Sequence, residues 1–212
     1  MKEVFNDYIN DKIKYERWQL IGIFCLIVVL AGFIGWIYEI VFYFFNGGMK
    51  EIYMQGGNFL PWINIYAIGA ILIIFLSYKF KKSKLLVFLI SFFSTGILEY
   101  LAGYLVYTIG NGTRYWDYNI EILNFGNING FVCLRSVLFF GISGLFLMYN
   151  VLPFCIYLSK KINKKIFLRI SVALLSIVLF DEFYNLIFSK IFHLPNAIDI
   201  YQSLGFKYQI HK

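Results

Sequence analysis

The sequence has few cysteines and lacks the common catalytic motifs. Its three cysteines, Cys25, Cys133 and Cys155, are odd in number and lack metal-ligand spacing. This argues against a disulfide framework and predicts that they are core residues. The chain contains no G-x4-G-K-[ST] phosphate loop, no Ser/His/Asp or Cys/His set and no metal motif. We therefore expect no enzymatic activity, no cofactor and no bound metal.

Charged residues are also scarce, at 15%, whereas hydrophobic residues make up 60% and aromatic residues 21% of the 212 positions. The mean hydropathy of +0.69 lies outside the range of soluble domains. Continuous apolar runs, without the short alternation of a β-barrel, are long enough to cross about 30 Å of hydrocarbon as helices. We predict an all-α, polytopic membrane protein with about five transmembrane helices, over residues 20–45, 60–79, 85–109, 130–158 and 166–192.

The basic residues predict an orientation in the cell (cytoplasmic) membrane. Most of the 19 Lys and Arg residues lie in the N-terminal segment and in the links 79–84 and 160–169, and such residues are retained on the cytoplasmic side. We expect a cytoplasmic interfacial segment (1–19), a transmembrane domain (20–192) and an extracytoplasmic tail (193–212). The net charge of +7 reflects this bias and attraction to anionic lipid, so nucleic-acid binding is not expected.

Ionisable side chains interrupt the apolar segments, namely Glu39, Glu99, Arg135, Asp181 and Glu182. Each charge costs roughly 2.5–3.5 kcal/mol at the bilayer centre, so these groups should face one another or a wet cavity. Helical spacing stacks Glu39 with Gly32 and Gly35, and Asp181 with Asn185. We expect an outward-facing acidic core. It is either a fixed structural core in which Arg135 pairs with Glu39 or Glu99, or a solute or ion site open to the exterior. A catalytic acid pair is a third interpretation, which the lack of an accompanying catalytic set or metal motif disfavours.

The segment between the third and fourth predicted helices is polar and aromatic. The residues of interest in this outer loop are Trp116, Asp117, Tyr118, Asn127 and Asn129. The rings of Trp116 and Tyr118, with that of Tyr115, suit the membrane interface. Asp117 and the asparagines could cap the start of the fourth helix. The loop is thus either an anchor in the interface or a lid over the acidic core.

The first two predicted helices show a weak internal sequence similarity to the next two. Gly35 and Glu39 correspond to Gly96 and Glu99, and NFLPWIN (58–64) corresponds to NFGNIN (124–129). A parallel hairpin repeat, as found in some transporters, is one interpretation, and simple duplication of a hairpin is the other.

Several motifs are shared with a known family. WDY (116–118) is followed by NING-x2-CL-x-S (127–136) and then by Gly141; weaker matches are W-x-x-E (36–39), P-x4-Y-x2-G (61–69) and E-x3-G (99–103). Over about residues 30–150 the chain resembles the bacterial integral-membrane proteins of the ABC-transporter type IV permease family. It departs from them at Phe131, where the family usually has Arg, and near Phe140, where it has Trp; Arg135 lies one turn further on.

The resemblance implies a small permease-like subunit of a transport system, with the ATP-binding subunit on a separate chain. Because the inner links are short, only the N-terminal segment, with Phe5, Tyr8, Ile9 and Ile13 on one side, could form an interfacial helix available to such a partner. Further expected partners are the lipid bilayer and a second copy of the chain. The alternative is a non-transporting membrane scaffold, regulatory or immunity protein whose polar core only fixes its fold.

Overall fold

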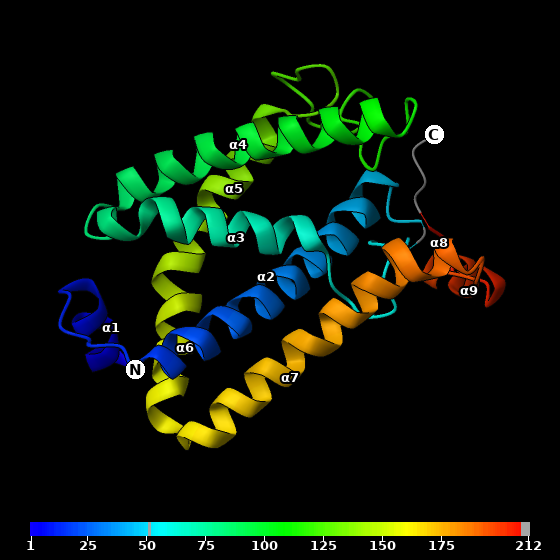
Figure 1. The fold of residues 1–212 in the computed structure, drawn as a ribbon. Helices are drawn as coiled ribbons and strands as arrows, with labels where there is room; N and C mark the ends of the chain where they lie inside the picture. Colours follow the sequence, from blue (N-terminus) through cyan, green and yellow to red (C-terminus); the bar gives the residue numbers. More distant parts are fainter. Residues whose placement is uncertain (51, 209–212) are drawn as a thin grey trace. The chain divides into compact units, whose positions relative to one another are not determined.

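The computed structural model describes residues 1–50 and 52–208, and within them the chain is helical, with isolated β-bridges but no strand. This confirms the predicted all-α class. The helices are α1 (Lys2–Ile9), α2 (Arg17–Asn46), α3 (Asn64–Ser77), η1 (Tyr78–Phe80), α4 (Lys84–Ile109), α5 (Leu134–Phe146), η2 (Leu147–Val151), α6 (Leu152–Lys161), α7 (Lys164–Phe183), η3 (Tyr184–Phe188), α8 (Ser189–Ile191) and α9 (Ala197–Ser203) (Figure 1).

Each predicted apolar segment is helical over most of its length. Among residues 1–50 and 52–208, three helices are long and apolar enough to cross a membrane, Arg17–Asn46, Lys84–Ile109 and Leu134–Lys161, and Asn64–Phe80 is a shorter apolar helix. The crossing itself stays a prediction for these helices and for α7, as does the orientation. The end of the predicted tail, residues 209–212, lies outside the described residues.

Two predicted helix starts, at 60 and 130, are four residues too early, because α3 begins at Asn64 and α5 at Leu134. Before α3, the amide of Trp62 donates to the carbonyl of Leu60, and that of Ile63 donates to the carbonyl of Gly32. These hydrogen bonds are not those of an α-helix. Before α5, Cys133 is extended and forms the N-cap. Residues 60–63 and 130–133 therefore belong to loops.

The chain divides into two compact units. Unit 1 contains Ile13–Ile68 and the described residues from Phe154 onward, and unit 2 contains Lys2–Lys12 and Gly69–Pro153. The chain passes from one unit to the other between Lys12 and Ile13, within α3 and again near the start of α6. Each unit has its own pair of packed helices, α2 with α7 and α4 with α5.

In unit 1, α2 lies along α7 (Figure 1). Small residues of α2 permit the close approach of α3 and of the segment before it: a Cβ at Gly32 would lie 2.2 Å from the Trp62 ring, and a Cβ at Gly35 would lie 2.1 Å from the Tyr66 ring. Trp62 Nε1 donates to the carbonyl of Val28 at 3.1 Å and so fixes the segment before α3 onto α2. Gly32 and Gly35 are buried, which confirms the inward face predicted for this helix.

In unit 2, α4 packs on α5 in the same manner. Thr95, Glu99 and Gly103 are buried on one face of α4, because residues four positions apart lie on the same side of a helix. Gly144 of α5 faces Ser91, whose Oγ would lie 2.0 Å from an added Cβ. Small residues at the helix contact let the two backbones approach closely, which is the usual packing of helices in membranes.

The N-terminal helix α1 docks on unit 2. Tyr8 is only 1% exposed, and the ring of Phe5 lies 6.4 Å from that of Tyr149. The buried Lys81 ammonium pairs with Asp11 and lies 3.9 Å from the centre of the Tyr78 ring. The side of α1 that we expected to be available to a partner is therefore largely covered by the chain itself, because its aromatic residues find aromatic partners in unit 2.

Candidate functional site

The polar residues of the helices form two clusters, one in each unit. The α4 cluster consists of Glu99, Tyr118, Glu121, Arg135 and Ser136. The α7 cluster consists of Asp181, Glu182 and Asn185 with the segment 58–64. In each cluster, buried carboxylates bind a loop of the same unit.

Glu99 lies at the centre of the α4 cluster and is only 6% exposed. One of its oxygens, Oε1, accepts a hydrogen bond from the hydroxyl of Tyr118 in the α4–α5 loop. The other, Oε2, lies 2.7 Å from Oγ of Ser136 at the start of α5. The side chain therefore connects α4 both to the loop and to α5.

Arg135 forms an ion pair with Glu121, with 2.6 Å between Nη2 and Oε2. Both side chains are largely buried, and the guanidinium carbon lies 5.2 Å from the centre of the Tyr118 ring. Tyr118 thus contacts both parts of the cluster, Glu99 through its hydroxyl and Arg135 through its ring face.

The phenol of Tyr118 is held in its neutral, donating form. Burial, and then the neighbouring Glu99 carboxyl, keep the pKa of Tyr118 well above its ordinary value. Tyr118 is 8% exposed, and the indole Nε1 of Trp116 donates to the carbonyl of Phe131 at 2.9 Å. Tyr118 is therefore buried within unit 2 with its hydroxyl turned toward Glu99, and its place at the membrane interface stays a prediction.

The remaining polar residues of the loop bond to one another. Asp117 accepts from the amide and side chain of Asn119, and Asn119 accepts from Asn127 at 2.8 Å. Asn127 in turn accepts from the amide of Gly130 at 2.8 Å, and Asn129 donates to the hydroxyl of Tyr100 on α4 at 3.2 Å. Asp117 and these asparagines fold the loop. The predicted capping of α5 is instead made by Cys133 with Ser136.

In the α7 cluster, Asp181 is 7% exposed and both of its oxygens accept hydrogen bonds. The backbone amide of Phe59 lies 3.1 Å from Oδ1, and that of Leu60 lies 2.7 Å from Oδ2. The side-chain amide of Asn185 also donates to Oδ1, at 2.8 Å, and is the third donor to this carboxylate. Asp181 therefore binds the main chain of the loop before α3.

Glu182 and Asn185 extend this contact. Glu182 accepts from the side chains of Asn58 at 2.6 Å and Asn64 at 2.5 Å. Asn185, in the π-helical turn η3, accepts from the amide of Ala197 at 2.7 Å and so fixes the start of α9. The α7 cluster thus connects α7 to the segment NFLPWIN and to α9.

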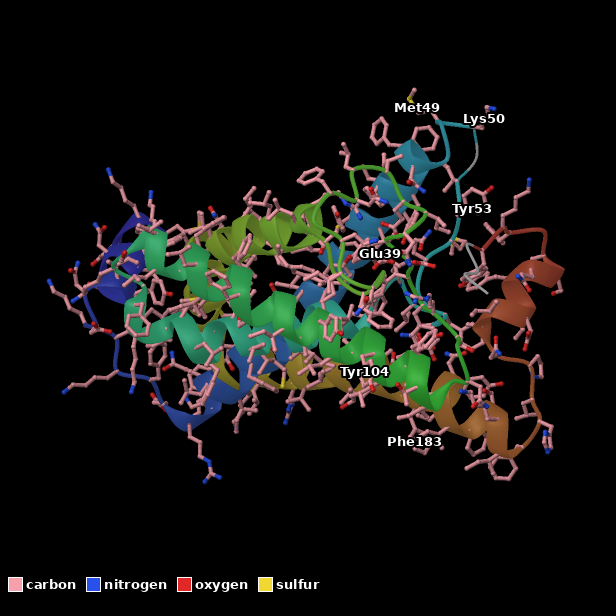
Figure 2. The ribbon with its side chains drawn as sticks, turned by 90° about the horizontal axis from the view of Figure 1, so that it is seen from above. Glu39, Met49, Lys50, Tyr53, Tyr104 and Phe183 are labelled. Atoms are coloured by element: carbon pink, nitrogen blue, oxygen red, sulfur yellow. The ribbon has the colours of Figure 1, made fainter. Side chains whose placement is uncertain are left out.

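Glu39 lies on α2 in unit 1 and is half-buried, while Glu99 and Arg135 lie in unit 2. In Figure 2 it is labelled on the helix that leads to the turn carrying Met49 and Lys50. The pairing of Glu39 with Arg135 stays a prediction.

Sequence reasoning missed four members of the two clusters. Glu121 and Ser136 are separated from their partners by 14 and 37 residues, and Asn58 is separated from Glu182 by 124; Asn64 is the fourth. Glu121 could have been noticed in the sequence, because it is the only charged residue between Asp117 and Arg135.

The three cysteines are free and buried, as predicted. Among residues 1–50 and 52–208, no group of three His, Cys, Asp or Glu side chains is placed to hold a metal ion. The contacts within the two clusters are hydrogen bonds and the Arg135–Glu121 ion pair.

Comparison with known proteins identifies a family. A family model described as "Putative ABC-transporter type IV" matches residues 20–186, a range that includes both clusters. No curated protein and no solved structure matches the chain. The match covers most of the sequence and agrees with the motifs around WDY (116–118), so the chain belongs to the ABC-transporter type IV family.

Proposed function

We propose that this chain is a permease-like membrane subunit of a transport system. The observation that carries the proposal is the family match over residues 20–186, which spans the apolar helices and both polar clusters. Because the sequence contains no phosphate loop, ATP would be hydrolysed by a separate subunit.

We infer that the two clusters hold loops at the carboxyl-terminal ends of α4 and α7. Glu99 lies ten residues before the end of α4, and Asp181 lies two residues before the end of α7. Each accepts hydrogen bonds from a loop that leads into a further apolar helix, α5 or α3. In a permease subunit, each loop fixed in this manner would line an entrance within its own unit, together with the carboxyl that binds it.

A second candidate function is a non-transporting membrane scaffold, regulatory or immunity protein. It is favoured by the satisfaction of both carboxyls: Glu99 and Asp181 receive donors from the chain itself and are buried. Buried carboxyls whose partners come from the chain itself can serve to specify one fold without binding a solute.

The transport proposal is tested by isolating the tagged chain from its native membranes in mild detergent, before and after chemical crosslinking. We expect an ATP-binding protein to be recovered in near-equal amount, and the isolated complex to hydrolyse ATP. The untagged strain is the control. Recovery of the chain alone, with and without crosslinking, would favour the scaffold function.

Carbodiimide labelling tests the role of the acids separately. This reagent modifies carboxyls that water can reach, so an entrance lined by Glu99 or Asp181 should be labelled, and a candidate solute or cation should protect it. Glu99→Gln and Asp181→Asn are the controls for assignment. Absence of labelling at every pH, with wild-type activity of both variants in cells, would assign the carboxyls a purely structural role.

A further inference from the structure

The α4–α5 loop exposes a group of apolar side chains. Within nine residues, those pointing to the surface are Ile120, Ile122, Leu123, Phe125 and Ile128. Leu123 and Phe125 are 61% and 51% exposed. Single exposed apolar residues are ordinary, but a contiguous group marks a surface that binds something apolar. We call residues 120–128 the apolar tip.

The loop is folded so that these side chains cannot turn inward. Its polar residues bond to one another through Asn119, Asn127 and Gly130, and Ile128 forms a bridge with Val132. Leu123 has a φ of 54°, a left-handed conformation that is costly for a residue with a branched side chain. This strained residue still presents its side chain outward, which indicates that the exposure is built into the loop.

The apolar tip is continuous with an apolar stripe on α5. The carbonyl of Phe125 accepts from the amide of Leu134 at 3.0 Å, and a Cβ at Gly126 would lie 3.2 Å from that of Leu134. From there, exposed apolar residues recur at four-residue spacing along α5, at Leu134, Leu138, Ile142 and Phe146. In a membrane-spanning helix such a stripe faces lipid. Phe125 therefore lies where the lipid-facing stripe reaches the loop.

The lack of exposed charge on the tip also favours contact with lipid over contact with water. Between residues 119 and 130 the only ionisable side chain is Glu121, which is buried and paired with Arg135. Exposed aromatic rings at the same end of α4, such as that of Tyr104 (Figure 2), are typical of the membrane interface. The tip thus presents apolar side chains and no charge next to a membrane-facing helix.

We propose that the apolar tip inserts into the boundary between headgroups and acyl chains of the leaflet that surrounds the start of α5. The insertion fixes the depth of the loop in the membrane. The same loop contacts the α4 cluster, because Tyr118 donates to Glu99 and Glu121 accepts from Arg135. The inference rests on α5 crossing the membrane and is independent of whether the protein transports anything or which side the loop occupies.

The test uses cysteines introduced at Leu123 and Phe125, each labelled with a nitroxide in the full chain reconstituted into phospholipid vesicles. Collision with oxygen, which concentrates in lipid, is compared with collision with a water-soluble nickel chelate. Thr113→Cys, an exposed polar position in the same loop, is the matched control. The labelled wild type corrects for the three native cysteines, which are buried.

We expect the oxygen-to-nickel collision ratio to shift upward at 123 and 125 relative to 113. An equal ratio at the three positions would place the tip in water and overturn the proposal. An immobilised label with few collisions of either kind would overturn it in favour of a protein partner. If the cysteine variants do not fold, Phe125→Trp provides a second measurement: phospholipids brominated on their acyl chains should quench its added fluorescence, and no added quenching would also overturn the proposal.

Discussion

Oγ of Ser136 on α5 lies 2.7 Å from Oε2 of Glu99 on α4. The same hydroxyl lies 2.8 Å from the carbonyl oxygen of Cys133, and it carries a single proton. It therefore donates to only one of these two acceptors. If it donates to Cys133, a protonated Glu99 completes the arrangement by donating to Ser136 while it accepts from Tyr118.

This arrangement predicts that Glu99→Gln is tolerated. The amide nitrogen of Gln can donate to Ser136 and its oxygen can accept from Tyr118, as the protonated acid does. Glu99→Leu should lower the free energy of unfolding by about 1–3 kcal/mol, because it leaves the buried Tyr118 hydroxyl without an acceptor. Unfolding titrations in mixed micelles measure both variants. Equal destabilisation by Gln and Leu would mean that the ionised carboxylate is required.

The α7 cluster predicts the opposite response. Both oxygens of Asp181 face donors, two of them backbone amides. Asp181→Asn turns an N–H toward one of these donors and should cost about 1–3 kcal/mol. Hydrogen exchange of the amides of Phe59 and Leu60 should quicken in this variant. Glu99→Gln, the comparable change in the other unit, is the control and should leave these two amides unaffected. Unchanged exchange in Asp181→Asn would refute the contact of Asp181 with the Phe59 and Leu60 amides.

Removal of Arg135 should be costly because it leaves Glu121 buried and charged. We expect Arg135→Leu to destabilise the protein by roughly 3–5 kcal/mol, and by clearly less in a Glu121→Gln background. A double-mutant cycle measures the difference. A parallel cycle with Glu39→Gln tests the pairing predicted from the sequence; strict additivity there would reject it.

Docking of α1 should depend on pH. A hydrogen bond from Lys81, and then its charge and that of Lys82, hold the pKa of Asp11 below its ordinary value. A carboxyl whose pKa is lowered by folding stabilises the docked state above its unfolded pKa, and this contribution is lost as the pH falls through the lowered value. α1 should therefore stay docked at neutral pH and loosen in acid.

Hydrogen exchange over residues 2–12 measures this docking across pH. Asp11→Asn should give fast exchange already at neutral pH, whereas Asp7→Asn, a carboxyl in the same segment, should behave as the wild type. If exchange in the wild type and Asp11→Asn is identical at neutral pH, the Asp11–Lys81 contact does not hold α1.

The orientation predicts which positions an impermeant thiol reagent can reach from outside. Lys81 is a poor position for labelling, because it is buried in the protein and would be shielded on whichever side of the membrane it lies. Exposed neighbouring positions are better. Cysteines in place of Lys82 and Lys161 should be shielded in intact cells, and those in place of Thr113 and Gln202 should be labelled. Labelling at 82 with shielding at 113 would reverse the orientation.

The hairpin repeat inferred from the sequence has a structural counterpart of limited extent. NFLPWIN (58–64) is bound by Asp181 and Glu182, and the loop that contains NFGNIN (124–129) is bound by Glu99 through Tyr118. In both units a helix carboxyl binds an Asn-rich loop. The carboxyls come from different places in the two halves, α7 and α4, and α2 packs along α7, so duplication of a complete hairpin stays a prediction.

Local patterns in the sequence were enough to predict the helices, their inward faces and the family. Apolar runs and the spacing of Gly32, Gly35, Thr95 and Glu99 are local properties, since a helix places residues three or four positions apart on one face whatever surrounds it. Only the tertiary structure decided which groups these faces meet. The contacts of Asp181 with Phe59 and of Glu99 with Ser136 span 122 and 37 residues. Such pairs depend on how separate helices and loops pack, and several alternative partners would satisfy the same buried carboxyl equally well.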